Sequence, residues 1–232
     1  AQDDGTAYNV TVATQPSGPS QTCTVTNGSG TLSGSDITNV QVDCVTDTFT
    51  VGGSVSGLAG SGLVLQNNGA DDLAIGTDGS FVFGAALDDG SGYAVTVETF
   101  PRTPDGFCEI SNGTGIINGS NVDDIFVTCE PGFTVGGAVS GLALPGLVLE
   151  LNGLSLLHFD QSGDFTFPRP LPDGANWEVT TLIEPRDHQC TLSFSNGTIT
   201  GADVTDVLLD CGTDIEFADD FEVLADTPIS LD

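Results

Sequence analysis

The six cysteines of this chain are spaced with a regularity that few folds can accommodate. They form three pairs with one constant separation inside each pair, and successive pairs follow at nearly equal intervals. Self-similarity at a fixed period is the signature of an internal repeat, in which one structural unit recurs along the chain. The pairs are Cys23 and Cys44, Cys108 and Cys129, and Cys190 and Cys211.

Other short sequences recur in step with the cysteines and define the repeat boundaries. Phe49-Thr-Val-Gly-Gly53 returns as Phe133-Thr-Val-Gly-Gly137, upstream of the second and third cysteine pairs. An Asn-Gly turn signal stands between the cysteines of every pair. These landmarks predict the second half of a repeat at residues 1–47, complete repeats at 48–131 and 132–213, and a tail at 214–232.

Each repeat reads as a series of short strands. Apolar residues alternate with polar ones in Tyr93-Ala-Val-Thr-Val97 and in the runs that end at Cys44, Cys129 and Cys211, which is the pattern of a half-buried strand. The cysteines share a face with the apolar residues, so their sulfurs should point into the core. No stretch has a convincing apolar period of 3.6 residues. We therefore expect an all-β fold of tandem β-sandwich repeats with little helix.

The paired cysteines could be metal ligands or disulfides. No Cys-x-x-Cys motif is present, and a zinc site needs four ligands clustered in space. One disulfide inside each repeat explains both the even count and the constant spacing, and we favour it. Closing a loop of this length stabilises a unit by about 3 kcal/mol in the chain-entropy model. Disulfides also indicate an oxidising compartment.

The segment between the first two cysteine pairs carries a recognisable order of motifs. Phe49-Thr-Val-Gly-Gly-Ser-Val-Ser-Gly-Leu58 is followed by Gly62-Leu-Val-Leu-Gln66, Asp78-Gly-Ser-Phe-Val-Phe83, Asp89-Gly90 and Tyr93-Ala-Val-Thr-Val97. This order resembles transthyretin-like, carboxypeptidase-regulatory β-sandwiches and the immunoglobulin-like repeats of secreted bacterial surface proteins. The resemblance implies a sandwich of about seven strands that serves as a spacer, adhesin stalk or accessory module.

The charge balance excludes several classes of partner. Three Lys+Arg residues stand against 33 Asp+Glu, for a formal net charge of −30. Binding to nucleic acid or to an anionic membrane needs a basic patch, which this composition cannot supply. No apolar run approaches the roughly 20 residues that span a bilayer. The hydrophobic fraction of 38% is nevertheless high enough to predict a folded chain.

Catalytic chemistry has little support in the sequence. No Gly-x-Ser-x-Gly pentapeptide is present, and the two histidines, His158 and His188, do not recur at equivalent repeat positions. We expect no enzyme activity.

Calcium is a candidate ligand because aspartates occur in pairs. Calcium prefers several oxygens converging from loops, which makes Asp71, Asp72, Asp88 and Asp89 candidate ligands between strands. Among them, only the Asp of Asp89-Gly90 recurs, as Asp4 and Asp173. An Asp-Gly that recurs between strands is first a turn, so a solvated acidic surface remains the alternative.

The incomplete repeat and the tail suggest how the chain is used. A sandwich that lacks its first strands exposes sheet edges and an apolar face, so a partner chain or neighbouring repeats of the same protein could complete it. The tail has apolar residues that could add to another subunit's sheet, giving head-to-tail filaments. These candidate assembly residues are Ile215, Phe217, Phe221, Ile229 and Leu231.

We therefore expect a non-enzymatic, extracellular structural protein, either a surface stalk or adhesin or a filament subunit. The hexapeptide Phe217-Ala-Asp-Asp-Phe-Glu222 is similar to an element near the C-termini of secreted gammaproteobacterial proteins, which suggests a bacterial source. The alternative is a glycan- or calcium-binding accessory module. An exposed Trp177 would favour glycan binding, whereas a buried one would not.

Overall fold

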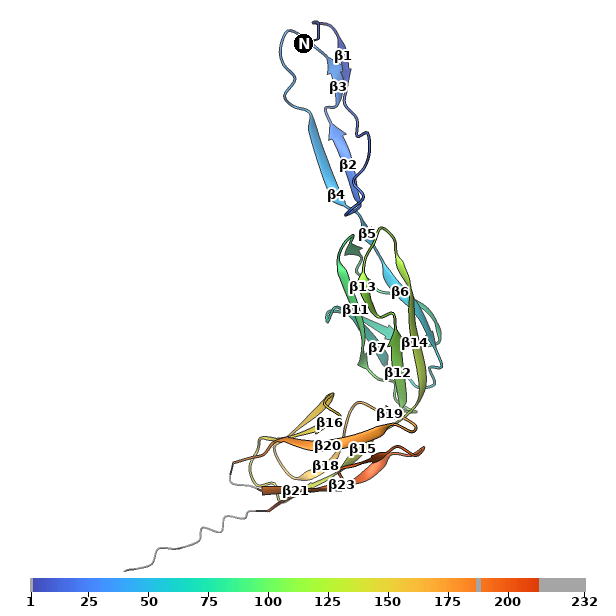
Figure 1. The fold of residues 1–232 in the computed structure, drawn as a ribbon, viewed down its shortest axis with the longest axis vertical. Coiled ribbons are helices and arrows are strands. Elements are labelled where there is room, and N and C mark those ends of the chain that lie inside the picture. The colour runs from blue at the N-terminus through green and yellow to red at the C-terminus, as the bar shows by residue number, and fades with distance from the viewer. Residues whose placement is uncertain (1, 187–188, 213–232) are drawn as a thin grey trace, which may run out of the picture. The chain divides into compact units, whose positions relative to one another are not determined.

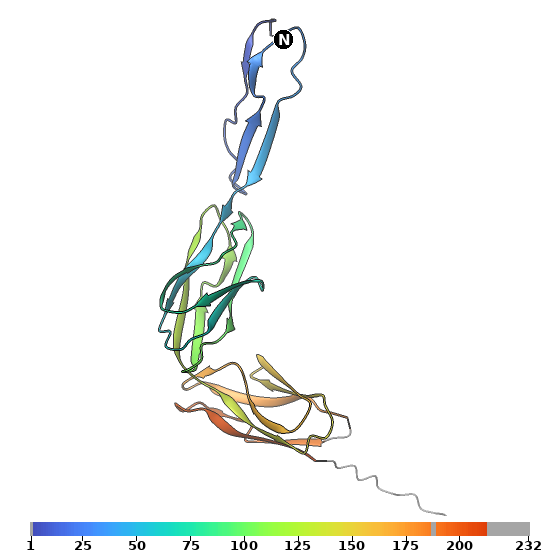
Figure 2. The ribbon, with the colours of Figure 1, turned by 180° about the vertical axis from the view of Figure 1, so that it is seen from behind.

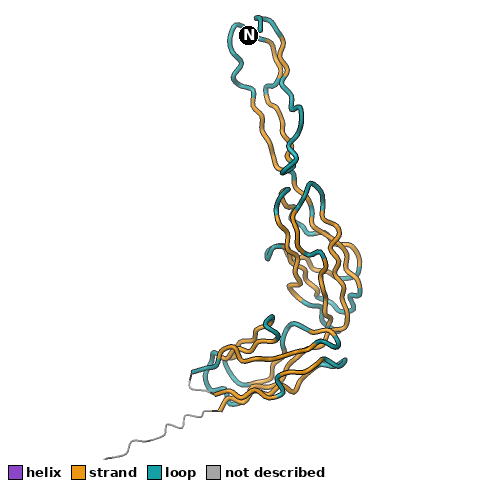
Figure 3. Tube along the Cα trace, viewed as in Figure 1, coloured by secondary structure: helices purple, strands orange, loops and turns teal. Residues whose placement is uncertain are grey.

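The computed structural model describes residues 2–186 and 189–212, and this part of the chain consists of strands, turns and loops without helix (Figure 3). The expected all-β fold class is confirmed for these residues. The chain divides into two units, Ala1–Gly132 and Phe133–Asp232. The incomplete repeat and the first complete repeat therefore belong to one unit.

The first complete repeat is a sandwich of two sheets (Figure 1). One sheet has the strand order β12-β14-β6-β9 and the other β13-β11-β7-β8. Strands β5 (Thr48–Phe49) and β10 (Leu87–Asp88) form an additional short antiparallel pair. The strands of the two sheets are β6 (Val51–Ser56), β7 (Leu63–Asn67), β8 (Asp71–Ile75), β9 (Gly79–Val82), β11 (Gly92–Thr99), β12 (Gly106–Ser111), β13 (Thr114–Ile116) and β14 (Val122–Phe133).

The second complete repeat has the same topology. Its sheets have the orders β18-β15-β23-β21 and β17-β16-β20-β22. These match the orders β9-β6-β14-β12 and β8-β7-β11-β13 of the first sandwich, strand for strand. In addition, β19 spans Leu171–Pro172. The remaining strands are β15 (Val135–Ser140), β16 (Leu147–Leu151), β17 (Ser155–Phe159), β18 (Gly163–Thr166), β20 (Asn176–Ile183), β21 (Gln189–Ser193), β22 (Asn196–Thr198) and β23 (Val204–Gly212).

Alternating side chains of both sheets fill the core of each sandwich, as the period of two predicts. In β14 the inward residues Ile125, Val127 and Cys129 are buried while the residues between them are exposed. Removal of these apolar surfaces from water is the main stabilising contribution to each sandwich. Each sandwich has its own buried cluster, one around Leu63 and Leu65 and the other around Leu147 and Leu149.

A glycine lets two parallel strands approach closely in each sandwich. Strand β6 runs parallel to β14, with Gly53 opposite Ile125, and β15 runs parallel to β23, with Gly137 opposite Val207. A Cβ added to Gly53 would lie 1.9 Å from the Ile125 carbonyl oxygen, and one added to Gly137 would lie 1.7 Å from that of Val207. Only glycine fits these two strand positions.

Residues 2–47 fold into two strand pairs that correspond to the second half of a sandwich. Their strands β1 (Ala7–Asn9), β2 (Gln21–Thr26), β3 (Ser29–Thr31) and β4 (Gln41–Thr46) form the pairs β1-β3 and β2-β4. These correspond to β11-β13 and β12-β14 of the first sandwich. Strands equivalent to β6 through β9 are absent from this half-repeat, as both views show (Figures 1 and 2).

Candidate functional site

The half-repeat presents an apolar face that both sandwiches bury. Val10 is 42% exposed, whereas its counterparts Val95 and Val179 are 5% and 1% exposed. Val42 is 55% exposed, whereas its counterparts Val127 and Leu209 are each 1% exposed. The residue types agree across the three copies, so the difference in burial comes from the missing strands.

This face borders a groove of about 570 Å³. Polar groups stand at its margin, among them Asp4 and Asp36. Its apolar lining comes from β1, the residue that follows it and the loop between β3 and β4, namely Tyr8, Val10, Leu32, Ile37 and Val40. We call this surface, together with Val42, the open face.

Each cysteine pair forms a disulfide between directly opposite residues of neighbouring antiparallel strands. The S–S distances are 2.01, 2.08 and 2.12 Å, and the Cα–Cα distances are 3.9, 4.1 and 4.0 Å. The expectation that the sulfurs point into a core fails at one position. Cys129 and Cys211 are buried, but Cys44 is exposed because no opposite sheet covers it.

We expect the Cys23–Cys44 bond to be reduced first. Thiol–disulfide exchange requires a thiolate to reach a sulfur, and Cys44 is exposed whereas Cys108 and Cys129 are both buried. Limited treatment with a thiol reductant, followed by alkylation and peptide mass spectrometry, should label Cys23 and Cys44 before the other four cysteines. Equal labelling of all six cysteines at short times would contradict this order.

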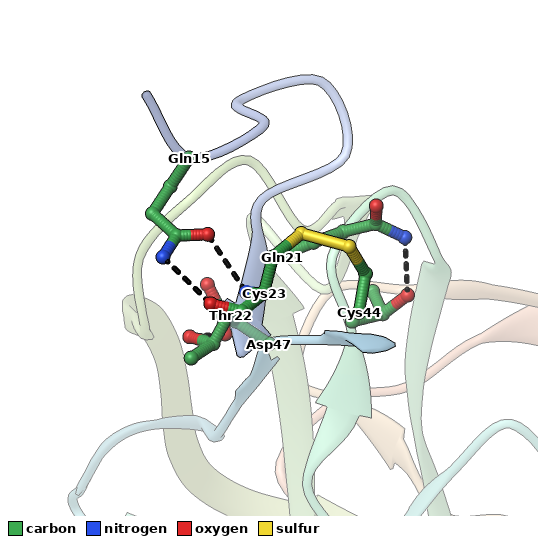
Figure 4. The surroundings of a disulfide bond; sticks show 7 residues. Gln15, Gln21, Thr22, Cys23, Cys44 and Asp47 are labelled. Atoms are coloured by element: carbon green, nitrogen blue, oxygen red, sulfur yellow. Dashed lines mark hydrogen bonds between the residues drawn. A yellow bond between two sulfur atoms is a disulfide. The ribbon is translucent and has the colours of Figure 1, made fainter. Parts of the chain in front are cut away.

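A carboxylate cluster joins the half-repeat to the first sandwich. Asp47 accepts hydrogen bonds from the hydroxyls of Ser20, at 2.5 Å, and Thr22, at 2.7 Å; Figure 4 shows Thr22 and Asp47 beside the first disulfide. Asp89 accepts the backbone N–H of Ser20 at 2.5 Å and that of Gly119 at 2.7 Å. The Asp89 N–H donates to the Asp47 carbonyl at 2.9 Å. We call this set the acidic joint.

The hydrogen bonds of the joint favour its ionised form. The Ser20 hydroxyl, and next the Thr22 hydroxyl, hold the pKa of Asp47 below its usual range, against burial and the charge of Asp89. The Ser20 backbone N–H, and next that of Gly119, lower the pKa of Asp89. A lowered pKa in the folded state means that the stabilisation is present above the ordinary pKa of an aspartate and is lost as the pH falls.

We therefore expect acid to break the hydrogen bonds of the acidic joint. Because the ordinary pKa of aspartate is about 3.9, the joint should stay closed at neutral pH and weaken below about pH 4. Protection of the Ser20 and Gly119 amides against hydrogen exchange, corrected for the intrinsic pH dependence, reports on it. Asp89→Asn should lower this protection at neutral pH. Protection that is unchanged in both acid and variant would contradict the expectation.

The four aspartates predicted as calcium ligands do not converge on a common point. Asp71 accepts from the Ala85 N–H at 2.9 Å, and Asp72 accepts from the Gln66 side-chain amide at 2.6 Å. Asp89 belongs to the acidic joint, and Asp88 lies beside it in sequence. Within residues 2–186 and 189–212, no group of three or more His, Cys, Asp or Glu residues is placed to hold a metal ion. Asp71, Asp72 and Asp89 are each directed at an N–H donor, and calcium binding by the four aspartates stays a prediction.

The recurring Asp-Gly has a structural role in all three copies. Asp4 accepts the N–H of Gly34, Asp89 that of Gly119, and Asp173 that of Gly201, each at 2.7 Å. The carboxylate thus ties one loop to the next in every repeat. This contact explains its recurrence without a ligand.

Trp177, whose exposure would have favoured glycan binding, is buried. Trp177 is 6% exposed and lies opposite Gly197 on β22. Tyr8 and Tyr93 lie in the same way opposite Gly30 and Gly115. The ring covers the glycine of the neighbouring strand, so Trp177 does not offer an exposed surface for stacking on a sugar.

The remaining candidate residues are placed as follows. His158 lies on β17 opposite Val148, while His188 and the five assembly residues of the tail lie outside the described residues. The described residues contain no helix of the length and apolar character required to cross a bilayer. The sequence did not reveal the acidic joint, because Asp47 and Ser20 have no counterpart of the same type in the next repeat, where Gly132 and Asp105 stand.

These features define the class of the chain as a tandem β-sandwich repeat protein with cross-strand disulfides. No protein-family profile and no curated protein matches it. Several solved structures are similar to it, including the following two. The Bacillus anthracis TIE protein shares 9% identity over 75% of this chain and 37% of that chain, with a TM-score of 0.26. Streptococcal High Identity Repeats in Tandem (SHIRT) domains 3–4 from a cell surface protein share 15% identity over 71% of this chain and 98% of that chain, with a TM-score of 0.21.

Proposed function

We propose that the chain is a non-enzymatic structural protein of the bacterial cell exterior, a stalk or filament segment that continues by β-strand addition. The observation that carries the proposal is the half-repeat, whose open face matches the buried core of two complete sandwiches in the same chain. A face of this kind is a template for added strands.

The disulfides support the extracellular setting. Three bonds at equivalent positions in three repeats indicate a protein that matures in an oxidising compartment. They also support a mechanical role, because each bond joins neighbouring strands and limits how far a repeat can extend. The strongly negative charge of the chain favours solubility of such a protein outside the cell.

Labelling of intact cells tests the proposal. Antibodies raised against the sandwiches and detected by immunogold electron microscopy on the source organism should decorate stalks or filaments outside the cell. Label confined to the cell interior, or cysteines that are reduced in protein taken directly from cells, would contradict it. The same antibodies on cells that lack the gene provide the control.

A further inference from the structure

Resting on the proposed function, the geometry points to the partner of the open face: a polypeptide segment that contains Val-Gly-Gly-x-Val and lies parallel to β4. The open face lacks only what β6 through β9 supply in the first sandwich. We call such a stretch, from β6 to β9 or from β15 to β18, a first-half segment.

The register of the two sandwiches predicts how the segment would lie. In the first sandwich Val55 is opposite Val127 and Gly53 opposite Ile125. In the second, Val139 is opposite Leu209 and Gly137 opposite Val207. Val40 and Val42 stand at the positions of Ile125 and Val127, one repeat earlier in the chain. The incoming segment would therefore place its second glycine opposite Val40 and its last valine opposite Val42.

The close approach of the strands makes this glycine a requirement. An added Cβ would meet a backbone carbonyl oxygen at 1.9 Å in one sandwich and at 1.7 Å in the other. A backbone atom cannot move aside as the end of a flexible side chain can. A strand with any other residue opposite Val40 would have to shift away from β4 and lose hydrogen bonds of the ladder.

The need for a glycine opposite Val40 excludes segments of residues 1–232 as the partner of the open face. The two Val-Gly-Gly-x-Val sequences, at 51–55 and 135–139, are already paired in their own sandwiches. The tail, residues 214–232, contains no glycine, so it cannot adopt this register. The partner is thus a first-half segment from outside residues 1–232. Its valines would cover Val10, Val40 and Val42 as the core of each sandwich covers their counterparts.

A peptide of residues 49–58, Phe-Thr-Val-Gly-Gly-Ser-Val-Ser-Gly-Leu, tests the inference. Labelled with a fluorophore and titrated into the intact oxidised chain, it should bind saturably. The Gly53→Ala peptide should bind at least tenfold more weakly. The Gly52→Ala peptide is the matched control. In the first sandwich a Cβ at Gly52 would meet the carbonyl oxygen of Phe81 on β9, but the peptide complex contains no β9. The affinity of the Gly52→Ala peptide should therefore equal that of the parent peptide.

Two variants of the chain test the site. Val42→Asp places a charge on the open face and should weaken peptide binding at least tenfold. Val45→Asp is the matched control: Val45 is 70% exposed, and its counterpart Glu130 is an exposed polar residue, so binding should be unchanged. Both positions are exposed in the absence of a partner. An intact Cys23–Cys44 disulfide and unchanged protection of the Ser20 amide against hydrogen exchange verify folding of the half-repeat.

Several results would overturn the inference. One is the absence of saturable binding to the folded chain. Another is equal binding of the Gly52→Ala and Gly53→Ala peptides. A third is that the intact chain self-associates, that removal of residues 214–232 abolishes this association, and that the peptide does not affect it. The last result would assign the open face to the tail. If the peptide binds the chain but the antibodies label only the cell interior, this inference stands and the proposed function is refuted.

Discussion

Gly137→Ala is expected to lower the free energy of unfolding of the second sandwich by about 3 kcal/mol, the upper part of the range for overpacking a tight site. The new methyl carbon would lie 1.7 Å from the Val207 carbonyl oxygen, so β15 and β23 must separate. Both strands lie in the middle of their sheet, and their separation disturbs Val139 and Leu209 in the core. The strain therefore cannot be relieved at an edge.

Denaturant unfolding followed by tryptophan fluorescence measures this effect in the second sandwich, because Trp177 is the only tryptophan of the chain and is buried there. Gly212→Ala is the matched control. It lies at the end of β23, and among the described residues an added Cβ would meet no heavy atom within 4 Å. The midpoint of this variant should therefore stay close to that of the parent chain. Equal midpoints for the two variants would show that the strand pair adapts to a side chain, and would also weaken the glycine requirement at the open face.

Much of this architecture follows from local patterns in the sequence. The spacing of Cys108 and Cys129 predicts a bond inside one repeat, and alternation in the run ending at Cys129 predicts the inward face of β14. Both depend on neighbouring residues and on strand geometry. The Asp-Gly turn at Asp89 was predicted for the same reason, although its acceptor contact with Gly119 is visible only in the structure.

Features that depend on the approach of distant strands were not predictable. Gly53 and Gly137 read as turn-like or weak strand residues in sequence, yet each is required by a parallel strand that comes much later in the chain. The exposure of Cys44 depends on which strands are missing, because its own alternating pattern matches that of Cys129. The acidic joint likewise depends on three residues from separate segments, Ser20, Asp47 and Asp89.

Stretching single molecules should show that each disulfide withholds a fixed length of chain. The bonded cysteines have a sequence separation of 21, and an extended chain spans at most about 3.3–3.6 Å per residue, so a bond removes about 70 Å from the unfolded contour length of its repeat. Replacing Cys108 and Cys129 by alanine should lengthen the unfolding step of residues 48–131 by that amount. It should also lower the free energy of unfolding of this sandwich by about 3 kcal/mol.

The other repeats provide the comparison within one molecule. The unfolding step of the second sandwich should keep its length in the Cys108→Ala, Cys129→Ala chain, because Cys190 and Cys211 remain joined. Reductant should then lengthen that step as well. A first-sandwich step that does not change on removal of its disulfide would mean that the strands between Cys108 and Cys129 resist the force without the bond. The disulfides would then stabilise the folded repeats but would not limit their extension, and the mechanical part of the proposed function would be lost.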